Sequence, residues 1–154
     1  MRRDEKDIKD RAEIDSTIRR SQVCRLGLSD NGQPYVVPLC FGYDGKALYF
    51  HCAKEGRKLD ILRRNGKVCF EFDIVEGMVE ADQGCHWGMR YQSVIGFGTA
   101  QLVEDVTQKK TALTILMAQY SKGSFVFPPE MLTSTAVVKI EIDSLTGKQS
   151  KRLT

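Results

Sequence analysis

Three apolar segments follow one another within thirty residues, and the short spacers between them restrict how this chain can fold. The segments are residues 23–28, 34–43 and 47–52, separated by Ser-Asp-Asn-Gly and Asp-Gly-Lys. Asn-Gly readily takes positive φ and is typical of a tight hairpin turn. A parallel pair of strands needs a crossover of about a dozen residues or more. The spacing therefore predicts an antiparallel meander and disfavours a parallel βαβ architecture.

Pro38 interrupts the second of these segments. Proline has no N–H group to donate to a neighbouring strand, so it is confined to edge strands and bulges. We therefore expect this strand at an edge of the sheet or at a bulge.

The rest of the chain predicts three more strands and a few helices. Residues 67–73 alternate between apolar and polar side chains, as in a half-buried strand. Gly96 and Gly98 mark a place where a barrel could bend. The other expected elements are strands at 92–103 and 138–142, helices from an Asp15 cap to Ser21, over 57–64 and from a Thr107 cap to Tyr120, and loops at 76–90 and 125–129.

These elements predict a mainly β fold, a six-stranded antiparallel β-barrel with a few helices. The 154 residues fit one domain, expected to span residues 1–154 with a charged N-terminal segment at residues 1–14. No apolar stretch approaches the roughly 20 residues of a membrane span. The polar N-terminus does not resemble a secretory signal. We therefore expect a cytoplasmic protein with no membrane partner.

The cysteines give no sign of a disulfide framework or a zinc site, because their number is odd and no C-x-x-C pair occurs. We therefore expect no metal. Four of them lie in or beside apolar segments and are expected to be small buried hydrophobes; these are Cys24, Cys40, Cys52 and Cys69. The fifth, Cys85, begins the sequence Cys85-His86-Trp87 in the predicted loop. Of these three residues, only Trp87 has an expected role, which is packing.

The net charge of +3 does not indicate a nucleic-acid partner, because acidic residues are interspersed along the chain. Residues 54–67 are the exception, with only Glu55 and Asp60 as acids. Stacking on single-stranded nucleic acid requires aromatic side chains, which this window lacks. We therefore expect no nucleic-acid binding from its basic residues, which are Lys54, Arg57, Lys58, Arg63, Arg64 and Lys67.

The stretch HCAKEGRKLD, residues 51–60, places basic side chains where the predicted helix begins. A helix N-terminus presents unpaired N–H groups and about half a positive charge. Gly56 would let the backbone approach a ligand closely, and Arg57 and Lys58 suit phosphate oxygens. The residue types alone leave two interpretations, a phosphate site or a solvated basic loop.

Three segments, PYVVPLCFGYDGKALYFHCAKEGRKLD, VCFEFD and YQSVIGFGTA, occur in this order. They resemble the FMN-binding split-barrel superfamily of pyridoxamine 5′-phosphate oxidase-like proteins. Within that superfamily the chain is most similar to the nitroimidazole-resistance, or Nim-type, branch. The similarity runs from about residue 15 to the final strand. It implies a homodimer with FMN in grooves at the subunit interface.

The resemblance also implies which residues hold FMN. Arg57 and Lys58 would hold the phosphate, and Ser93 would reach the phosphate or the ribityl chain. Residues 37–39 would line the isoalloxazine ring, and residues 51–53 would close the site. The predicted cofactor-binding residues are Val37, Pro38, Leu39, His51, Cys52, Ala53, Arg57, Lys58 and Ser93.

His51 has two interpretations. It could be a structural group that hydrogen-bonds FMN or the backbone. Alternatively, it is the tentative catalytic residue, which orients a substrate or supplies a proton, since histidine titrates near neutral pH.

The resemblance implies an FMN-dependent oxidoreductase of the nitroimidazole reductase type. The flavin would take electrons from NAD(P)H or another donor and pass them to a small acceptor, such as a nitro group. The chain ends SLTGKQSKRLT, without the basic motif that grips the substrate in pyridoxamine phosphate oxidases, which disfavours synthesis of pyridoxal phosphate. It also has no Gly-rich dinucleotide fingerprint, so a nicotinamide donor would dock without a Rossmann domain.

One alternative is a non-catalytic flavin- or haem-binding protein that stores or senses its cofactor. In the haem case, His51 or Cys52 would be the axial ligand. A second alternative, nucleic-acid binding by residues 54–67, would require strongly salt-dependent affinity for DNA.

Overall fold

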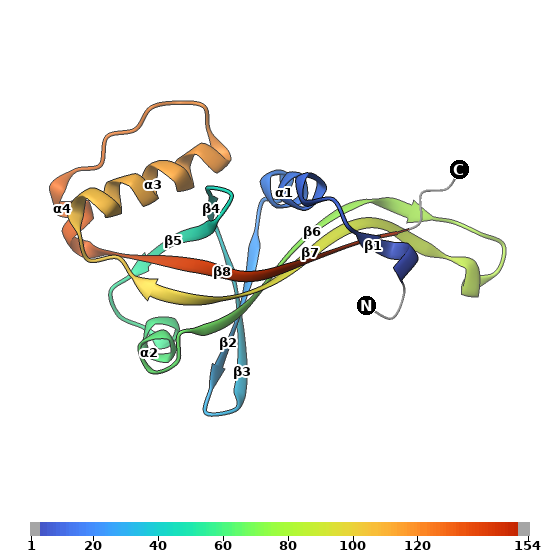
Figure 1. Cartoon of the computed structure of the whole chain (residues 1–154), viewed down its shortest axis with the longest axis horizontal. Helices are drawn as coiled ribbons and strands as arrows, with labels where there is room; N and C mark the ends of the chain where they lie inside the picture. The colour runs from blue at the N-terminus through green and yellow to red at the C-terminus, as the bar shows by residue number, and fades with distance from the viewer. Residues whose placement is uncertain (1–3, 151–154) are drawn as a thin grey trace.

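The computed structural model describes residues 4–150, which form an antiparallel sheet with helices on both of its sides (Figure 1). The strands are β1 (Asp7–Ile8), β2 (Cys24–Asp30), β3 (Gln33–Leu39), β4 (Gly42–Tyr43), β5 (Ala47–Ala53), β6 (Lys67–Val79), β7 (Gly88–Leu102) and β8 (Thr135–Gln149). The helices are α1 (Arg11–Arg20), α2 (Arg57–Arg64), α3 (Val106–Tyr120) and α4 (Pro129–Ser134), with single 3₁₀ turns at Asp4–Lys6 and Gly84–His86.

The strand order is β3-β2-β6-β7-β8-β5-β4, and β1 pairs with β8. All of these pairs are antiparallel. The mainly β antiparallel split barrel is therefore confirmed. The described residues form eight strands rather than six, because β1 and β4 have two residues each and are too short to show a periodicity.

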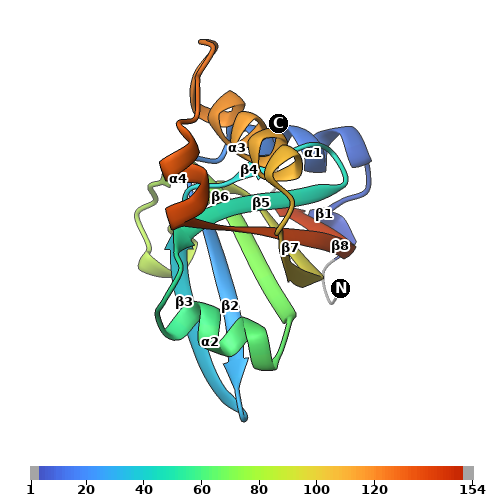
Figure 2. The same cartoon turned by 90° about the vertical axis from the view of Figure 1, so that its left-hand side faces the viewer.

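The larger of two hydrophobic clusters in the described residues lies between the inner face of the sheet and the helices, and the smaller lies around α3 and α4. Leu26, Phe70, Phe72 and Val94 of the central strands are completely buried in the larger cluster. Helices α1 and α3 lie on one side of the strands and α2 on the other (Figure 2). Successive side chains in a strand point to opposite faces. The residues next to these core residues in β2, β6 and β7 therefore lie on the outer face of the sheet.

Gly96 and Gly98 lie where β7 bends, as predicted. The register of β7 against β8 shifts between Phe97 and Gly98. A Cβ atom at Gly96 would overlap the ring of Phe70, and one at Gly98 would overlap the backbone of Glu141. Both positions therefore need glycine because neighbouring strands approach them closely.

Residues 76–90 form a hairpin arm, so the prediction of a loop is wrong. Strand β6 continues to Val79 and β7 begins at Gly88. Pairing of β7 with β8 begins only at Gln92, so the residues of β7 before it pair with β6 alone. Figure 1 shows the arm extending beyond the body of the molecule. The arm gave no strand pattern because neither of its faces is buried against the sheet.

The predicted caps of two helices are also wrong. Asp10, not Asp15, caps α1, and its carboxylate accepts a hydrogen bond from a backbone N–H at 2.9 Å. Asp105, not Thr107, caps α3 in the same way, also at 2.9 Å. In both cases the predicted cap falls inside the helix. By contrast, the helix over 57–64 and the edge position of Pro38 are confirmed.

The cysteines are free, and their burial differs from the prediction. Cys24 is buried, Cys52 and Cys69 are half-buried, and Cys40 is exposed. The prediction is wrong for Cys40 because this residue follows the end of β3, in the link to β4, rather than continuing the strand. None of the helices within residues 4–150 has the length and the apolar content needed to cross a membrane.

Replacing Gly96 by alanine should lower the free energy of unfolding by roughly 1–3 kcal/mol, since overpacking a tight core has about this effect. The physical cause is the overlap with Phe70. Denaturant titration measures the change. Gly84→Ala is the control, because a Cβ there meets no atom within 4 Å and stability should stay within about 0.5 kcal/mol. Equal stability of the two variants would contradict the close approach.

Candidate functional site

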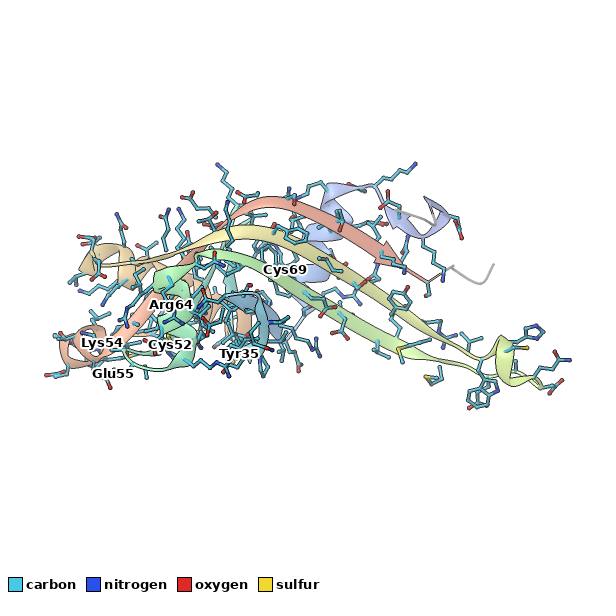
Figure 3. The ribbon with its side chains drawn as sticks, turned by 90° about the horizontal axis from the view of Figure 1, so that it is seen from below. Tyr35, Cys52, Lys54, Glu55, Arg64 and Cys69 are labelled. Atoms are coloured by element: carbon cyan, nitrogen blue, oxygen red, sulfur yellow. The ribbon has the colours of Figure 1, made fainter. Side chains whose placement is uncertain are left out.

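A cavity of about 260 Å³ opens where β5 passes into α2. Its walls come from three elements that are separate in the sequence. Strand β3 contributes Tyr35 and Val37, β5 contributes Cys52 and Ala53, and the start of α2 contributes its first residues. Figure 3 shows Cys52 and Glu55 beside α2, with Tyr35 of β3 near them. The predicted three-strand meander is wrong beyond its first hairpin, because residues 34–43 divide into β3 and β4 at opposite ends of the strand order and β5 pairs with β4 and β8. The edge strand β3 nevertheless lies beside the basic segment, since both line this cavity.

Gly56 shapes the backbone at this cavity. It has φ 130° and ψ 161°, a conformation that L-residues with a side chain rarely adopt. It precedes α2 without a side-chain cap, although its carbonyl accepts a hydrogen bond from Asp60 N at 3.1 Å. The first N–H groups of α2 are therefore not capped by a side chain of residue 56, which leaves them available to an anion.

Arg57 and Lys58 also line the cavity, as does Glu55. The Arg57 guanidinium carbon lies 4.5 Å from the centre of the Tyr35 ring, and Lys58 Nζ lies 5.2 Å from the centre of the Phe50 ring. Among residues 4–150, neither side chain has an acidic partner. Cation–π contacts hold both cations without neutralising them.

Other basic residues of the segment do have acidic partners. Arg63 pairs with Asp60 at 3.5 Å, and Arg64 pairs with Asp30 at 2.8 Å. A solvated basic loop would distribute its charges without regard to a cavity. Here the unpaired charges of α2 are those on the cavity wall, which favours the phosphate-site interpretation.

The thiol of Cys52 faces the same cavity. Burial raises its pKa, and the nearby charges of Lys58 and Arg63 oppose this in part. Cys52 is therefore protonated at neutral pH and contributes an apolar surface rather than a nucleophile.

The structure brings five of the nine predicted binding residues onto one cavity: Val37, Cys52, Ala53, Arg57 and Lys58. The other four do not line it. Leu39 packs against the core, and His51 is exposed on β5. Pro38 pairs with Arg25 on the sheet edge, and Ser93 pairs with Asp73 and Lys148 near the arm. The roles of these four remain predictions.

Tyr35 is the wall residue that the sequence did not assign to the site. It lies two positions before Val37 in β3, so both point to the same face. This alternation was a usable signal, but the contact with Arg57 depends on how β3 lies against α2.

The outer face of the sheet carries a second group of exposed side chains. Strand register aligns Val36, Gly27, Cys69 and Phe97 across β3, β2, β6 and β7. Val36 is 63% exposed and Phe97 54% exposed. Ile95 lies two residues from Phe97, on the same face, and is also exposed. Large exposed apolar patches are typical of protein–protein interfaces.

Solved structures of several bacterial proteins are similar to this chain. A protein from Bacteroides thetaiotaomicron, described as a candidate 5-nitroimidazole antibiotic resistance protein, is 36% identical, with a TM-score of 0.83 over 92% of this chain and 85% of that one. The flavocytochrome Anf3 from Azotobacter vinelandii is 21% identical, with a TM-score of 0.83 over 95% and 70% of the two chains. An FAD- and haem-binding protein from Mycobacterium smegmatis is 22% identical, with a TM-score of 0.86 over 96% and 74%. The last two likenesses show the fold alone.

Sequence comparisons agree with this fold. An uncharacterized protein of Rhizobium meliloti is 29% identical in an alignment of 90 residues, with coverage of 49% of this chain and 59% of that protein. Residues 10–149 match the model of the family described as pyridoxamine 5′-phosphate oxidase. The fold is that of pyridoxamine 5′-phosphate oxidase-like proteins. Because the match spans nearly all of the described residues, this chain belongs to the pyridoxamine 5′-phosphate oxidase family.

Proposed function

We propose that this chain is an FMN-dependent oxidoreductase that reduces nitro groups or a related small acceptor. The observation that carries this proposal is the pair of unneutralised cations, Arg57 and Lys58, on the wall of the cavity at the start of α2. The 36% identity with the Bacteroides protein supports the choice of acceptor. NAD(P)H is the proposed donor and the cytoplasm the proposed location.

The chain's own residues would bind and orient the cofactor. Arg57 can donate two parallel hydrogen bonds to phosphate oxygens, Lys58 adds a point charge, and the α2 N–H groups complete the cradle. The Tyr35 ring would hold the Arg57 guanidinium in place by stacking against it. When bound, FMN supplies the electron-transfer chemistry.

We also propose a homodimer that contains FMN at its interface. The exposed row through Val36 and Phe97 offers the apolar surface that a second copy would cover. Ser93 lies on the same face of β7 as Ile95 and Phe97, and it does not line the cavity of its own chain. In a dimer, Ser93 would therefore reach a cofactor held by the partner.

His51 is the proposed proton donor to the acceptor. Its side chain is exposed, and alternation along β5 places it on the opposite face from Cys52. A position outside the phosphate cavity fits a residue that meets the acceptor rather than the cofactor phosphate.

Replacing both Arg57 and Lys58 by alanine should weaken FMN binding by a factor of roughly 10²–10⁴, since a hydrogen bond to a charged group contributes about 1.5–3 kcal/mol. The measurement is flavin fluorescence or absorbance during titration with FMN. The double variant Arg64→Ala/Lys67→Ala loses the same charge outside the cavity and should bind FMN as the unchanged protein does. Equal flavin affinity in the two double variants would rule out the phosphate cradle.

Replacing His51 by alanine should leave flavin affinity within about threefold and lower the rate of nitro reduction, because general acid catalysis contributes roughly 10²–10⁴-fold. Stopped-flow oxidation of the reduced protein by a nitroimidazole separates the two effects. His86→Ala, on the arm, is the control. Lost flavin would assign His51 to binding, and an unchanged rate would remove it from the chemistry. Retained flavin with no turnover in the unchanged protein would instead favour a storage or sensing role.

Replacing Phe97 by glutamate should dissociate the proposed dimer, since a charge buried without a partner is strongly unfavourable. Light scattering should then give the protomer mass, 17.4 kDa. Val126→Glu is the control, because Val126 is 93% exposed in the link between α3 and α4 and lies outside the outer face. A monomeric unchanged protein, or a dimer that survives Phe97→Glu, would contradict this interface.

A further inference from the structure

A second cavity, of about 230 Å³, lies on the other side of the Ala53–Lys54 link. Lys54, Arg63 and Lys109 line it, together with residues 102–104 at the end of β7 and residues 136–137 of β8. Ala53 borders the first cavity and Lys54 the second, so consecutive residues contribute to the two spaces. Figure 3 shows Lys54 on the segment that leads into α2.

Lys109 is the most unusual member of this group, since it is only 8% exposed although it is charged. Its Nζ donates hydrogen bonds to the carbonyls of Leu132 and Thr135, at 3.1 and 3.2 Å. Carbonyls are neutral, and an ammonium group has three donors, so these bonds leave its charge unpaired and a donor free. This contact also has a structural role, because it ties α3 to the junction of α4 and β8.

Positive charge exceeds negative charge around this cavity. Glu104 is the acidic residue on its wall, against three basic ones. Among residues 4–150, neither Lys54 nor Lys109 forms an ion pair, and Arg63 is also fixed by a hydrogen bond to the carbonyl of Lys54 at 3.3 Å. Lys109 is buried without an acidic partner, which is costly and makes an anionic ligand favourable here. Lys54 and Arg63 are exposed and add positive charge to the cavity wall, although Arg63 also pairs with Asp60.

An apolar cavity of about 280 Å³ adjoins the basic one and shares Arg63 and Leu102 with it. Leu62, Val138 and Leu102 form its aliphatic wall, and Gln101 supplies an amide that can both donate and accept hydrogen bonds. The combined space therefore has an anion-binding end and an apolar end with one polar side chain.

We propose that this paired cavity binds a phosphorylated adenosine group. The phosphate would lie among Lys54, Arg63 and Lys109, and the base would lie on the aliphatic wall with Gln101 at its edge. Two sources share this chemistry, the adenylate half of a flavin dinucleotide and the adenylate half of a nicotinamide donor. The assignment of a source rests on the proposed function, whereas the binding of adenosine phosphate does not.

The experiment is titration calorimetry of the full chain with ADP as the probe. The double variant Lys54→Ala/Arg63→Ala should bind ADP more weakly by roughly 10- to 100-fold, because two charge-assisted hydrogen bonds are lost. Arg64→Ala/Lys67→Ala is the matched control for charge and should bind ADP normally. Lys109→Met tests the third cation, with thermal unfolding to confirm that the fold survives.

The outcomes separate this site from the flavin phosphate site. Arg57→Ala/Lys58→Ala should lose FMN and keep ADP, whereas Lys54→Ala/Arg63→Ala should lose ADP and keep FMN. If Lys54→Ala/Arg63→Ala also loses a preference for FAD over FMN, the adenylate belongs to the flavin. If this variant raises the KM for NAD(P)H instead, the adenylate belongs to the nicotinamide donor. The proposal is overturned if the unchanged protein does not bind ADP, or if Lys54→Ala/Arg63→Ala and Arg64→Ala/Lys67→Ala bind ADP equally well.

Discussion

Burial of Leu59 and Ile61 fixes helix α2, and the positions of the basic residues on both cavities depend on that anchorage. Both side chains are essentially inaccessible to solvent. Each contributes about 1.5–3 kcal/mol when fully buried, which is enough to set the rotation of an eight-residue helix. Once these two side chains are buried, the basic residues of the helix must lie on its exposed surface and at its ends. Arg57 and Lys58 then border one cavity, and Arg63 borders the other.

The sequence predicted the elements that have one buried face. Residues 67–73 alternate because Val68, Phe70 and Phe72 enter the core, and the limits of α2 follow from its apolar stripe and the Asn-Gly that ends it. The arm escaped prediction for the same physical reason, since its side chains are not sorted into inner and outer sets. Strand β8 was predicted too short, because beyond residue 142 it carries polar residues and a glycine while its backbone continues to pair with β7.

The candidate site was predictable where its residues are neighbours in the sequence. Residues 52, 53 and 55–58 lie on one cavity because a strand end, a glycine turn and a helix start follow one another directly. Tyr35 could not be assigned in this way, because its contact with Arg57 depends on the packing of β3 beside α2. His51 and Ser93 were assigned from resemblance, and local periodicity places both on faces away from the cavity. Sequence adjacency therefore predicts the cavity residues that follow one another in the chain, and not those that separate strands contribute.

The arm and the outer face pose one physical problem together. In β7, residues 88–91 pair only with β6, apart from a contact between Tyr91 and Ser150, and an isolated two-stranded hairpin is marginally stable in water. Met78, Trp87 and Met89 are nonetheless exposed on it, beside a sheet face that exposes Ile95 and Phe97. Such surface is unfavourable in a lone protomer and favourable once covered. Because the arm and the face belong to the same two strands, a second copy that covered both would couple the stability of the arm to dimerisation.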